Sequence, residues 1–171
     1  METFDIDSKK IQEELEEATS SFVKNVQAFS AENINTKLAA DKWSAAQVAD
    51  HVIKSNGSIS KALQLSGQRM IRKPDERVNE LRKVFLDFDT KLNAPSFIIP
   101  DDDLFSKETV LATLEHSISK LLQLATQQDL SVTINHPAFG DITKLEIIHF
   151  VIYHTQRHSY QLQNIFRALS K

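Results

Sequence analysis

Two histidines near the C-terminus, His154 and His158, have the spacing of a metal-binding pair. Residues four apart lie on one face of a helix, so an H-x-x-x-H pair presents two imidazole nitrogens to a single point. Such a pair is half of a zinc or nickel site. The residues between them, Thr155-Gln156-Arg157, lack the glutamate general base of the metalloprotease H-E-x-x-H pattern. The chain contains no cysteine, so a metal must be held by nitrogen or oxygen, and thiol nucleophiles are excluded.

Both imidazoles are expected inside the apolar stripe of their helix. At about 100° per residue, His158 lies about 40° from His154. Their stripe is shared with apolar residues at Ile147, Val151, Leu162, Ile165 and Leu169. An unpaired buried polar group costs about 1–3 kcal/mol, and an ordinary core avoids incurring that cost twice. Metal binding is therefore one interpretation of the pair, and two hydrogen-bonded core histidines are the other.

A third ligand must come from another helix, and His51 is the best candidate. It lies at the edge of the buried face of its own helix, where an exposed or capping histidine is the alternative. His136 is a rival, but its proline neighbour and the nearby Gly140 indicate a turn that positions the last helix. By helical angle, His116 and His149 face away from the core.

Gln161 is a candidate supporting residue. It lies about 20° from His154 around the helix, where it could hydrogen-bond a ligand imidazole or bound water. A polar residue on a helix flank is the alternative. Arg157 and Tyr160 point away from the pair and receive no role.

The elements that must position these residues are four amphipathic helices. Ser44 with Gln47, and Thr143 with Glu146, fit the capping box that begins a helix. Apolar residues repeat at steps of three and four over residues 8–33, 44–66, 107–128 and 143–171. The sequence therefore predicts an all-α fold, a four-helix bundle.

A long crossover joins the second and third of these helices. About forty residues, 67–106, would form an improbable structureless loop, so a short helix is expected over 75–87 and an extended segment over 97–100. A second connection covers 129–141. Neither repeats nor low-complexity tracts interrupt the chain, so residues 1–171 are interpreted as a single domain.

Composition narrows the classes of function. With 20 Lys and Arg against 23 Asp and Glu, the net charge of −3 provides no reason to expect a nucleic-acid partner. The acidic N-terminus does not resemble a signal peptide, and no stretch has the roughly 18 apolar residues that cross a membrane. A cytoplasmic protein without a membrane or nucleic-acid partner is expected.

Two motifs resemble those of the DinB/YfiT-like superfamily. Trp43-Ser44 followed by His51 resembles the start of the family's second helix. Near the C-terminus, the segment 136–143 and the His154, His158 and Gln161 run are similar to the family pattern HP-x-x-G-x-x-T followed by H-x-x-x-H-x-x-Q. The resemblance extends over nearly the whole chain.

The resemblance implies a four-helix bundle with a divalent metal, zinc or nickel, bound by His51, His154 and His158. It also implies a metal-dependent enzyme of the thiol S-transferase or hydrolase type, because characterised branches include thiol S-transferases and a thiol-dependent isomerase. Without cysteine in the chain, a low-molecular-weight thiol would be the cosubstrate beside a second small molecule. A homodimer is expected as well. A non-catalytic, metal-stabilised bundle or interaction domain is the alternative, and an empty triad is a third reading, so whether the protein is an enzyme stays open.

Overall fold

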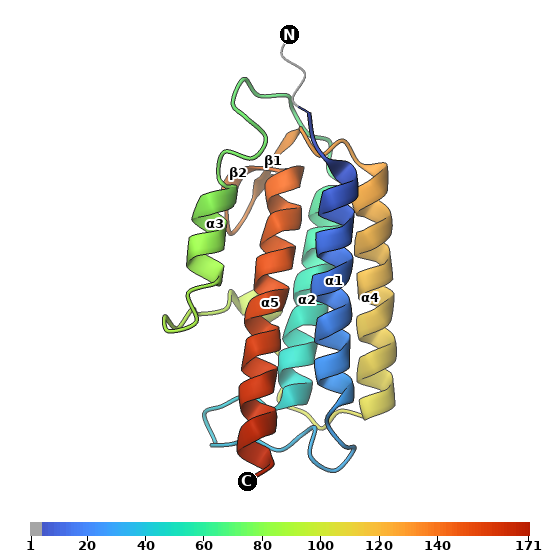
Figure 1. The fold of residues 1–171 in the computed structure, drawn as a ribbon, viewed down its shortest axis with the longest axis vertical. Helices are drawn as coiled ribbons and strands as arrows, with labels where there is room; N and C mark the ends of the chain where they lie inside the picture. The colour runs from blue at the N-terminus through green and yellow to red at the C-terminus, as the bar shows by residue number, and fades with distance from the viewer. Residues whose placement is uncertain (1–4) are drawn as a thin grey trace.

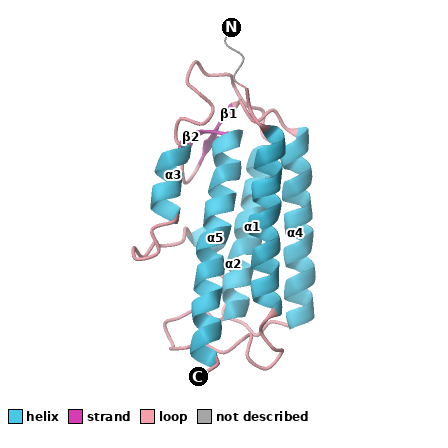
Figure 2. Ribbon diagram, in the orientation of Figure 1, coloured by secondary structure: helices cyan, strands magenta, loops and turns pink. Residues whose placement is uncertain are grey.

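Four long helices pack side by side in the computed structural model, which describes residues 5–171 (Figures 1 and 2). They are α1 (Ser8–Gln27), α2 (Ala45–Leu63), α4 (Lys107–Gln127) and α5 (Lys144–Leu169). The smaller elements are the helix α3 (Val78–Phe85), the 3-10 turn η1 (Ser96–Ile98) and the strands β1 (Thr133–His136) and β2 (Gly140–Thr143). The predicted four-helix bundle is confirmed.

The helix starts follow the predicted capping chemistry. Both capping boxes form: Ser44 and Gln47 exchange side-chain and backbone hydrogen bonds before α2, as Thr143 and Glu146 do before α5. The first helix ends six residues earlier than the predicted Asn33, at Gln27. In the turn beyond it, Ser30 and Asn33 bond each other's backbone N–H groups, which competes with helix continuation.

The direction of the helices explains the long crossover. In Figure 1, α1 and α5 run downward while α2 and α4 run upward. The two parallel pairs, α1 with α5 and α2 with α4, are joined by the antiparallel contacts of α1 with α4 and of α2 with α5. The chain leaves α2 at the top and must enter α4 at the bottom. With a rise of 1.5 Å per residue, a 19-residue helix such as α2 is about 28 Å long, so no tight turn can join this parallel pair.

The apolar core divides into two clusters along the bundle axis. One contains Leu15, Leu63, Leu121 and Ile147, and the other contains Phe22, Val48, Leu114 and Leu162. On α5, the first cluster extends to Ile152 and the second begins at Leu162, so His154 and His158 lie between them. A polar layer therefore separates two apolar ones.

Two connections differ from the sequence-based expectation. Residues 133–143 form an antiparallel hairpin that was not predicted, in which Gly140 adopts a positive φ of 65° that suits glycine. The segment expected to be extended over 97–100 instead contains η1, and its extended backbone begins at Ile99. The short helix predicted over 75–87 is present as α3, within those bounds.

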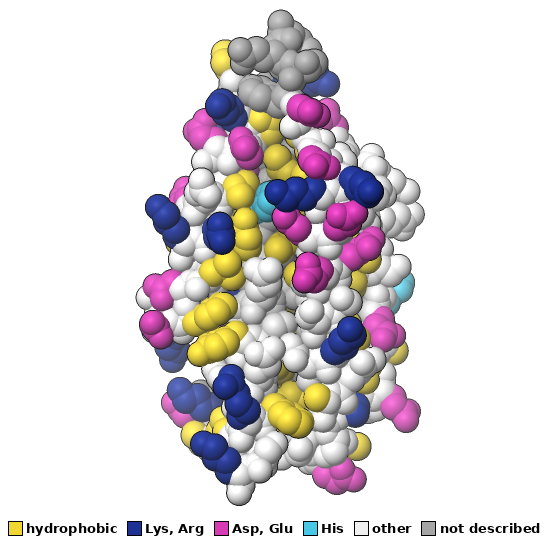
Figure 3. Space-filling view, in the orientation of Figure 1, with side chains coloured by type: hydrophobic (Ala, Val, Ile, Leu, Met, Phe, Trp, Pro, Cys, Tyr) yellow, Lys and Arg dark blue, Asp and Glu magenta, His cyan; other side chains and the backbone are white. Residues whose placement is uncertain are grey.

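The surface mixes charges of both signs. Figure 3 shows lysine and arginine side chains interspersed with aspartate and glutamate over one face of the molecule. Across residues 5–171, every helix is too short or too polar to cross a lipid bilayer.

Candidate metal centre

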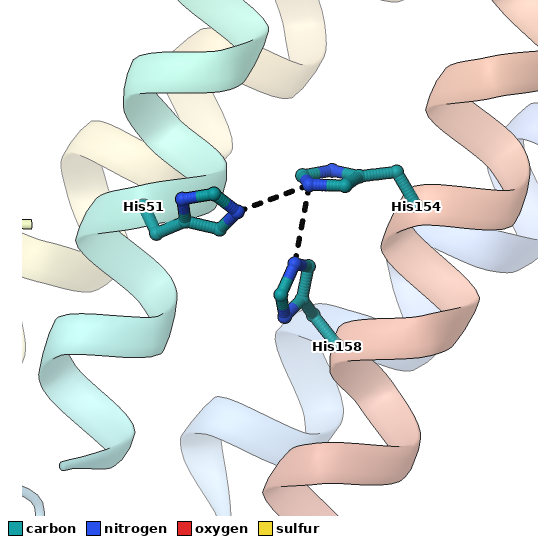
Figure 4. Close-up of side chains that lie close together, drawn as sticks. All are labelled: His51, His154 and His158. Carbon is teal, nitrogen blue, oxygen red and sulfur yellow. Dashed lines mark hydrogen bonds between the residues drawn. The ribbon is translucent and has the colours of Figure 1, made fainter. Parts of the chain in front are cut away.

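Three imidazoles from two helices converge in the middle of the bundle (Figure 4). His51 comes from α2, and His154 and His158 lie one turn apart on α5. The Nε2 atom of His154 is 3.0 Å from Nε2 of His51 and 3.1 Å from Nε2 of His158. One ligand atom from each residue lies within 4.8 Å of the others. The structure thus brings together the three histidines that the sequence singled out.

The outer nitrogens of two of these rings are held by hydrogen bonds. His51 Nδ1 is 2.8 Å from the carbonyl oxygen of Ile98, and His158 Nδ1 is 2.7 Å from Oε1 of Gln161. An amide or peptide oxygen can only accept, so each Nδ1 carries the proton. The Nε2 atoms of His51 and His158 therefore present lone pairs to the centre, which is the orientation that outer hydrogen bonds give to metal-ligating histidines.

The protein's own hydrogens do not satisfy every nitrogen of the cluster. Two lone pairs, on His51 and His158, face the single Nε2 atom of His154. That nitrogen carries at most one hydrogen, so it cannot serve two acceptors with two full hydrogen bonds. A divalent cation accepts all three lone pairs at once when His154 also presents its own. The donor set therefore fits the nitrogen-ligated metal that the sequence indicated.

Burial keeps these imidazoles neutral. It lowers the pKa of His154 well below the ordinary value, and the neighbouring rings of His158 and His51 lower it further. Burial, and then the proximity of His51, lower the pKa of His158 to about 3. The pKa of His51 is also lowered by burial, although the Ile98 carbonyl opposes the shift. All three are thus in the metal-binding form at neutral pH.

Aromatic side chains surround the triad. The ring of Trp43 lies 5.0 Å from that of His51, Phe150 lies 5.0 Å from His154, and Phe85 lies 6.1 Å from His154. Relative exposures are only 2% for His51, 6% for His154 and 8% for His158. Within residues 5–171, histidines alone make up the cluster, so a bound ion would keep its charge in apolar surroundings.

The other histidines lie elsewhere. His136 is buried in β1, where its Nδ1 accepts a hydrogen bond from the backbone N–H of Ala138, so it belongs to the hairpin turn and not to the triad. His116 is exposed on α4, as its helical angle predicts. His149 is half-buried, with its Nδ1 3.4 Å from the hydroxyl of Tyr153.

Two contributors to the site escaped the sequence reasoning. The Ile98 carbonyl that orients His51 is a backbone group 47 residues away, and no residue type encodes it. Arg157 was assigned no role because it points away from the triad, but its guanidinium binds carbonyl oxygens of the crossover beside the triad. For Ile98, the available signal in the sequence was the apolar run 97–99 before Pro100, which predicts a segment packed against the bundle.

The fold and the cluster together define a helical bundle with a buried histidine centre suited to a divalent cation. The chain belongs to the DinB superfamily, whose sequence pattern it matches over residues 14–162. The predicted family is therefore confirmed. Among individual proteins, the chain is similar to YuaE of Bacillus subtilis (strain 168), with 26% identity over 150 residues that make up 85% of this chain and 91% of YuaE.

Solved structures support the same fold. The four-helix bundle protein TT2238 has a TM-score of 0.61 and 21% identity, over 92% of this chain and 98% of its own. YfiT from Bacillus subtilis also has a TM-score of 0.61, with 14% identity over 99% of this chain and 92% of its own. YfiT is described as a probable metal-dependent hydrolase with an unusual four-helix bundle topology. At these identities, the likeness establishes the fold.

Proposed function

We propose that this protein is a divalent-metal-dependent enzyme of the hydrolase or thiol S-transferase type, with zinc or nickel bound by His51, His154 and His158. One observation carries the proposal: two imidazole lone pairs face a third nitrogen that has at most one proton to offer. Membership of the DinB superfamily and the description of YfiT as a probable metal-dependent hydrolase support it. A divalent ion held by three neutral imidazoles is a Lewis acid that lowers the pKa of a water molecule in its remaining position to about 7, and binds a thiol as the thiolate.

The chain's own residues prepare this chemistry. The Ile98 carbonyl and the Gln161 amide oxygen hold two rings with their lone pairs inward. Trp43, Phe85 and Phe150 exclude bulk water from the cluster, so charges inside interact strongly. Because the chain has no cysteine, thiol transfer requires a low-molecular-weight thiol as cosubstrate.

Metal analysis followed by turnover assays tests the proposal. Protein purified without chelators or metal-affinity columns is expected to contain close to one zinc or nickel ion per chain. The loaded protein is then assayed for conjugation of small thiols to electrophiles and for ester and amide hydrolysis. His51→Ala is expected to lose both metal and turnover, whereas His116→Ala, on the exposed side of α4, keeps both. Protein without metal, and with no affinity for added zinc, would overturn the proposal.

The non-catalytic, metal-stabilised bundle is the second candidate, and the burial of the triad favours it. Exposures of 2–8% leave little room for a substrate beside the ion in the closed structure. In this case chelation lowers the free energy of unfolding, but no substrate is turned over across the panel. A retained metal without turnover would therefore select this alternative.

A further inference from the structure

The triad faces the seam between α2 and α5, and the crossover lies across that seam. Figure 1 shows the yellow-green part of the crossover beside α5, about midway along the bundle. It reaches the triad at two points: Phe85 lies against His154, and the Ile98 carbonyl binds His51. The chain between these points must pass from the α5 side of the triad to the α2 side.

On the α5 side, one side chain makes the hydrogen bonds to residues 85–90 of the crossover. The guanidinium of Arg157 donates hydrogen bonds to the carbonyl oxygens of Asp87, at 2.6 Å, and Thr90, and a longer one of 3.4 Å to that of Phe85. The ring of Phe88 also stacks on Tyr160, with centroids 4.4 Å apart, but remains 41% exposed. Rotation of the Arg157 side chain would release all three carbonyls at once.

On the α2 side, the attachment is ionic and distributed. Lys54 binds the carboxylate of Asp101 at 2.7 Å and the carbonyl oxygen of Ile99 at 2.9 Å. Asp50 accepts a hydrogen bond from the backbone N–H of Asp101 at 2.9 Å. Several groups hold this end, so loss of one contact does not free it.

Between the two attachments, the crossover is weakly held. Among the described residues, no hydrogen bond joins residues 91–97 to any of the four long helices. Phe97 is 50% exposed, and Leu92 is 36% exposed. Segments with few hydrogen bonds and little burial open at low free-energy cost.

We propose that residues 86–97 form a lid over the entrance to the triad, and that Arg157 is the positioning residue that latches this lid onto α5. The lid pivots between the end of α3 and the ionic attachment on α2. Its purpose rests on the proposed function, because a buried triad needs an entrance only if an ion or substrate must reach it. Arg157 donates its hydrogen bonds to the crossover and to none of the three imidazoles. Its charge also lowers the pKa of His154 and His158 through space, but burial alone keeps both rings neutral, so we expect its effect on their accessibility to pass through the lid.

Histidine labelling of the metal-free protein tests the lid without relying on bound metal. Diethyl pyrocarbonate acylates neutral imidazoles that it can reach, and peptide mass spectrometry reports the rate at each histidine. In the wild type, the triad is expected to react far more slowly than exposed His116. Loss of charge-assisted hydrogen bonds in Arg157→Met is expected to raise the triad's rate about tenfold or more.

Two internal references separate lid opening from general loss of structure. His136 is buried in the hairpin, away from the lid, so its rate rises only if the whole protein unfolds more often. Arg167→Met is the matched control variant, because the side-chain bonds of Arg167 stay within α5. Arg157→Lys, which keeps the charge but not the branched donor, is expected to give an intermediate rate.

Each labelling outcome either supports or overturns the lid. Faster labelling of the triad in Arg157→Met with unchanged His136 supports the lid. A triad rate equal to that of the wild type, or a rise shared by His136, would overturn it. If Arg157→Met does not fold, Phe88→Ala at the exposed stack provides the same comparison. Failure of the proposed function has a different signature, since absence of metal in the purified protein leaves these labelling rates unchanged.

Discussion

Helix α5 carries two buried polar clusters that differ in one respect: only one of them is complete. At the N-terminal end of α5, the fully buried carboxylate of Glu146 accepts hydrogen bonds from the two terminal guanidinium nitrogens of Arg72, at 2.6 and 2.7 Å. The backbone N–H groups of Arg77 and Thr143 complete its shell, at 2.8 and 2.9 Å. Two turns further along, the triad has two lone pairs directed at one nitrogen.

The difference separates a structural cluster from a binding one. Both clusters contact the crossover: Glu146 binds Arg72 and Arg77, and His154 of the triad packs against Phe85. The first is satisfied by the protein's own atoms, so it needs nothing more to stabilise the fold. In the second, a positive centre would satisfy the imidazole lone pairs, and the chain itself does not provide one. The unsatisfied lone pairs therefore make the second cluster the candidate binding site.

The largest expected effect comes from breaking the complete cluster. Arg72→Met leaves the buried Glu146 carboxylate without its ion-pair partner, and removing one member of a buried pair costs about 3–5 kcal/mol. Urea unfolding is expected to show this loss with and without zinc. Arg69→Met, an arginine with a 66% exposed side chain in the same segment, is the control and is expected to change little. A loss that zinc restores would contradict the assignment of this cluster as purely structural.

The incomplete cluster should respond to metal instead. Zinc at 100 times its dissociation constant is expected to raise the free energy of unfolding by about 2.7 kcal/mol, since the ion binds the folded state. The gain disappears in His158→Ala and with a chelator, but persists in His116→Ala. Thermal or urea unfolding with and without zinc measures it. Equal stabilisation of the wild type and His158→Ala would show that the ion binds elsewhere.

A smaller effect is expected from the side chain that orients His158. Gln161→Leu removes the acceptor 2.7 Å from His158 Nδ1, and loss of such outer hydrogen bonds weakens metal affinity about 10- to 100-fold. Competition with a chromophoric chelator measures the dissociation constant. Gln163→Leu, at an exposed position on the same helix, should leave it unchanged. An unaltered affinity in Gln161→Leu would mean that Gln161 does not orient the ligand.

The two clusters should also differ in pH dependence. Burial lowers the pKa of each triad imidazole from about 6.5, so the unfolded chain binds more protons as the pH falls below that value. This contribution to stability is therefore full above pH 6.5 and is lost as the pH falls toward the folded pKa, by at most about 1.4 kcal/mol per pH unit for each imidazole.

Glu146 contributes in a lower window. Burial alone raises its pKa, but the bonds from Arg72, Thr143 and Arg77 outweigh burial and leave the pKa below the ordinary 4.5. Its contribution is present above that value and is lost only as the pH falls further. Between pH 6.5 and 5, metal-free His158→Ala is thus expected to show a shallower slope than the wild type, while Arg69→Met, whose exposed side chain lies outside both clusters, keeps the wild-type slope. An identical slope in His158→Ala would contradict a buried, neutral His158.

Local sequence determined the helices and half of the centre. Ser44 with Gln47, and Thr143 with Glu146, specify helix starts through hydrogen bonds within four residues, and both form as predicted. The four-residue spacing of His154 and His158 places both rings on one face for the same reason, since helix geometry depends only on neighbours along the chain. The end of α1 was placed too late because the side chains of Ser30 and Asn33 compete with helical bonding.

Only tertiary structure decided how the centre is completed and covered. His51 joins the α5 pair across 103 residues of sequence because α2 packs beside α5, and its ring is oriented by a backbone carbonyl that any residue at position 98 would provide. Arg157 acquired a partner for a similar reason, since its acceptors are main-chain oxygens of the crossover. Residue types and their periodicity encode which face a side chain occupies. They do not encode which distant backbone meets that face, because every peptide unit presents the same carbonyl oxygen.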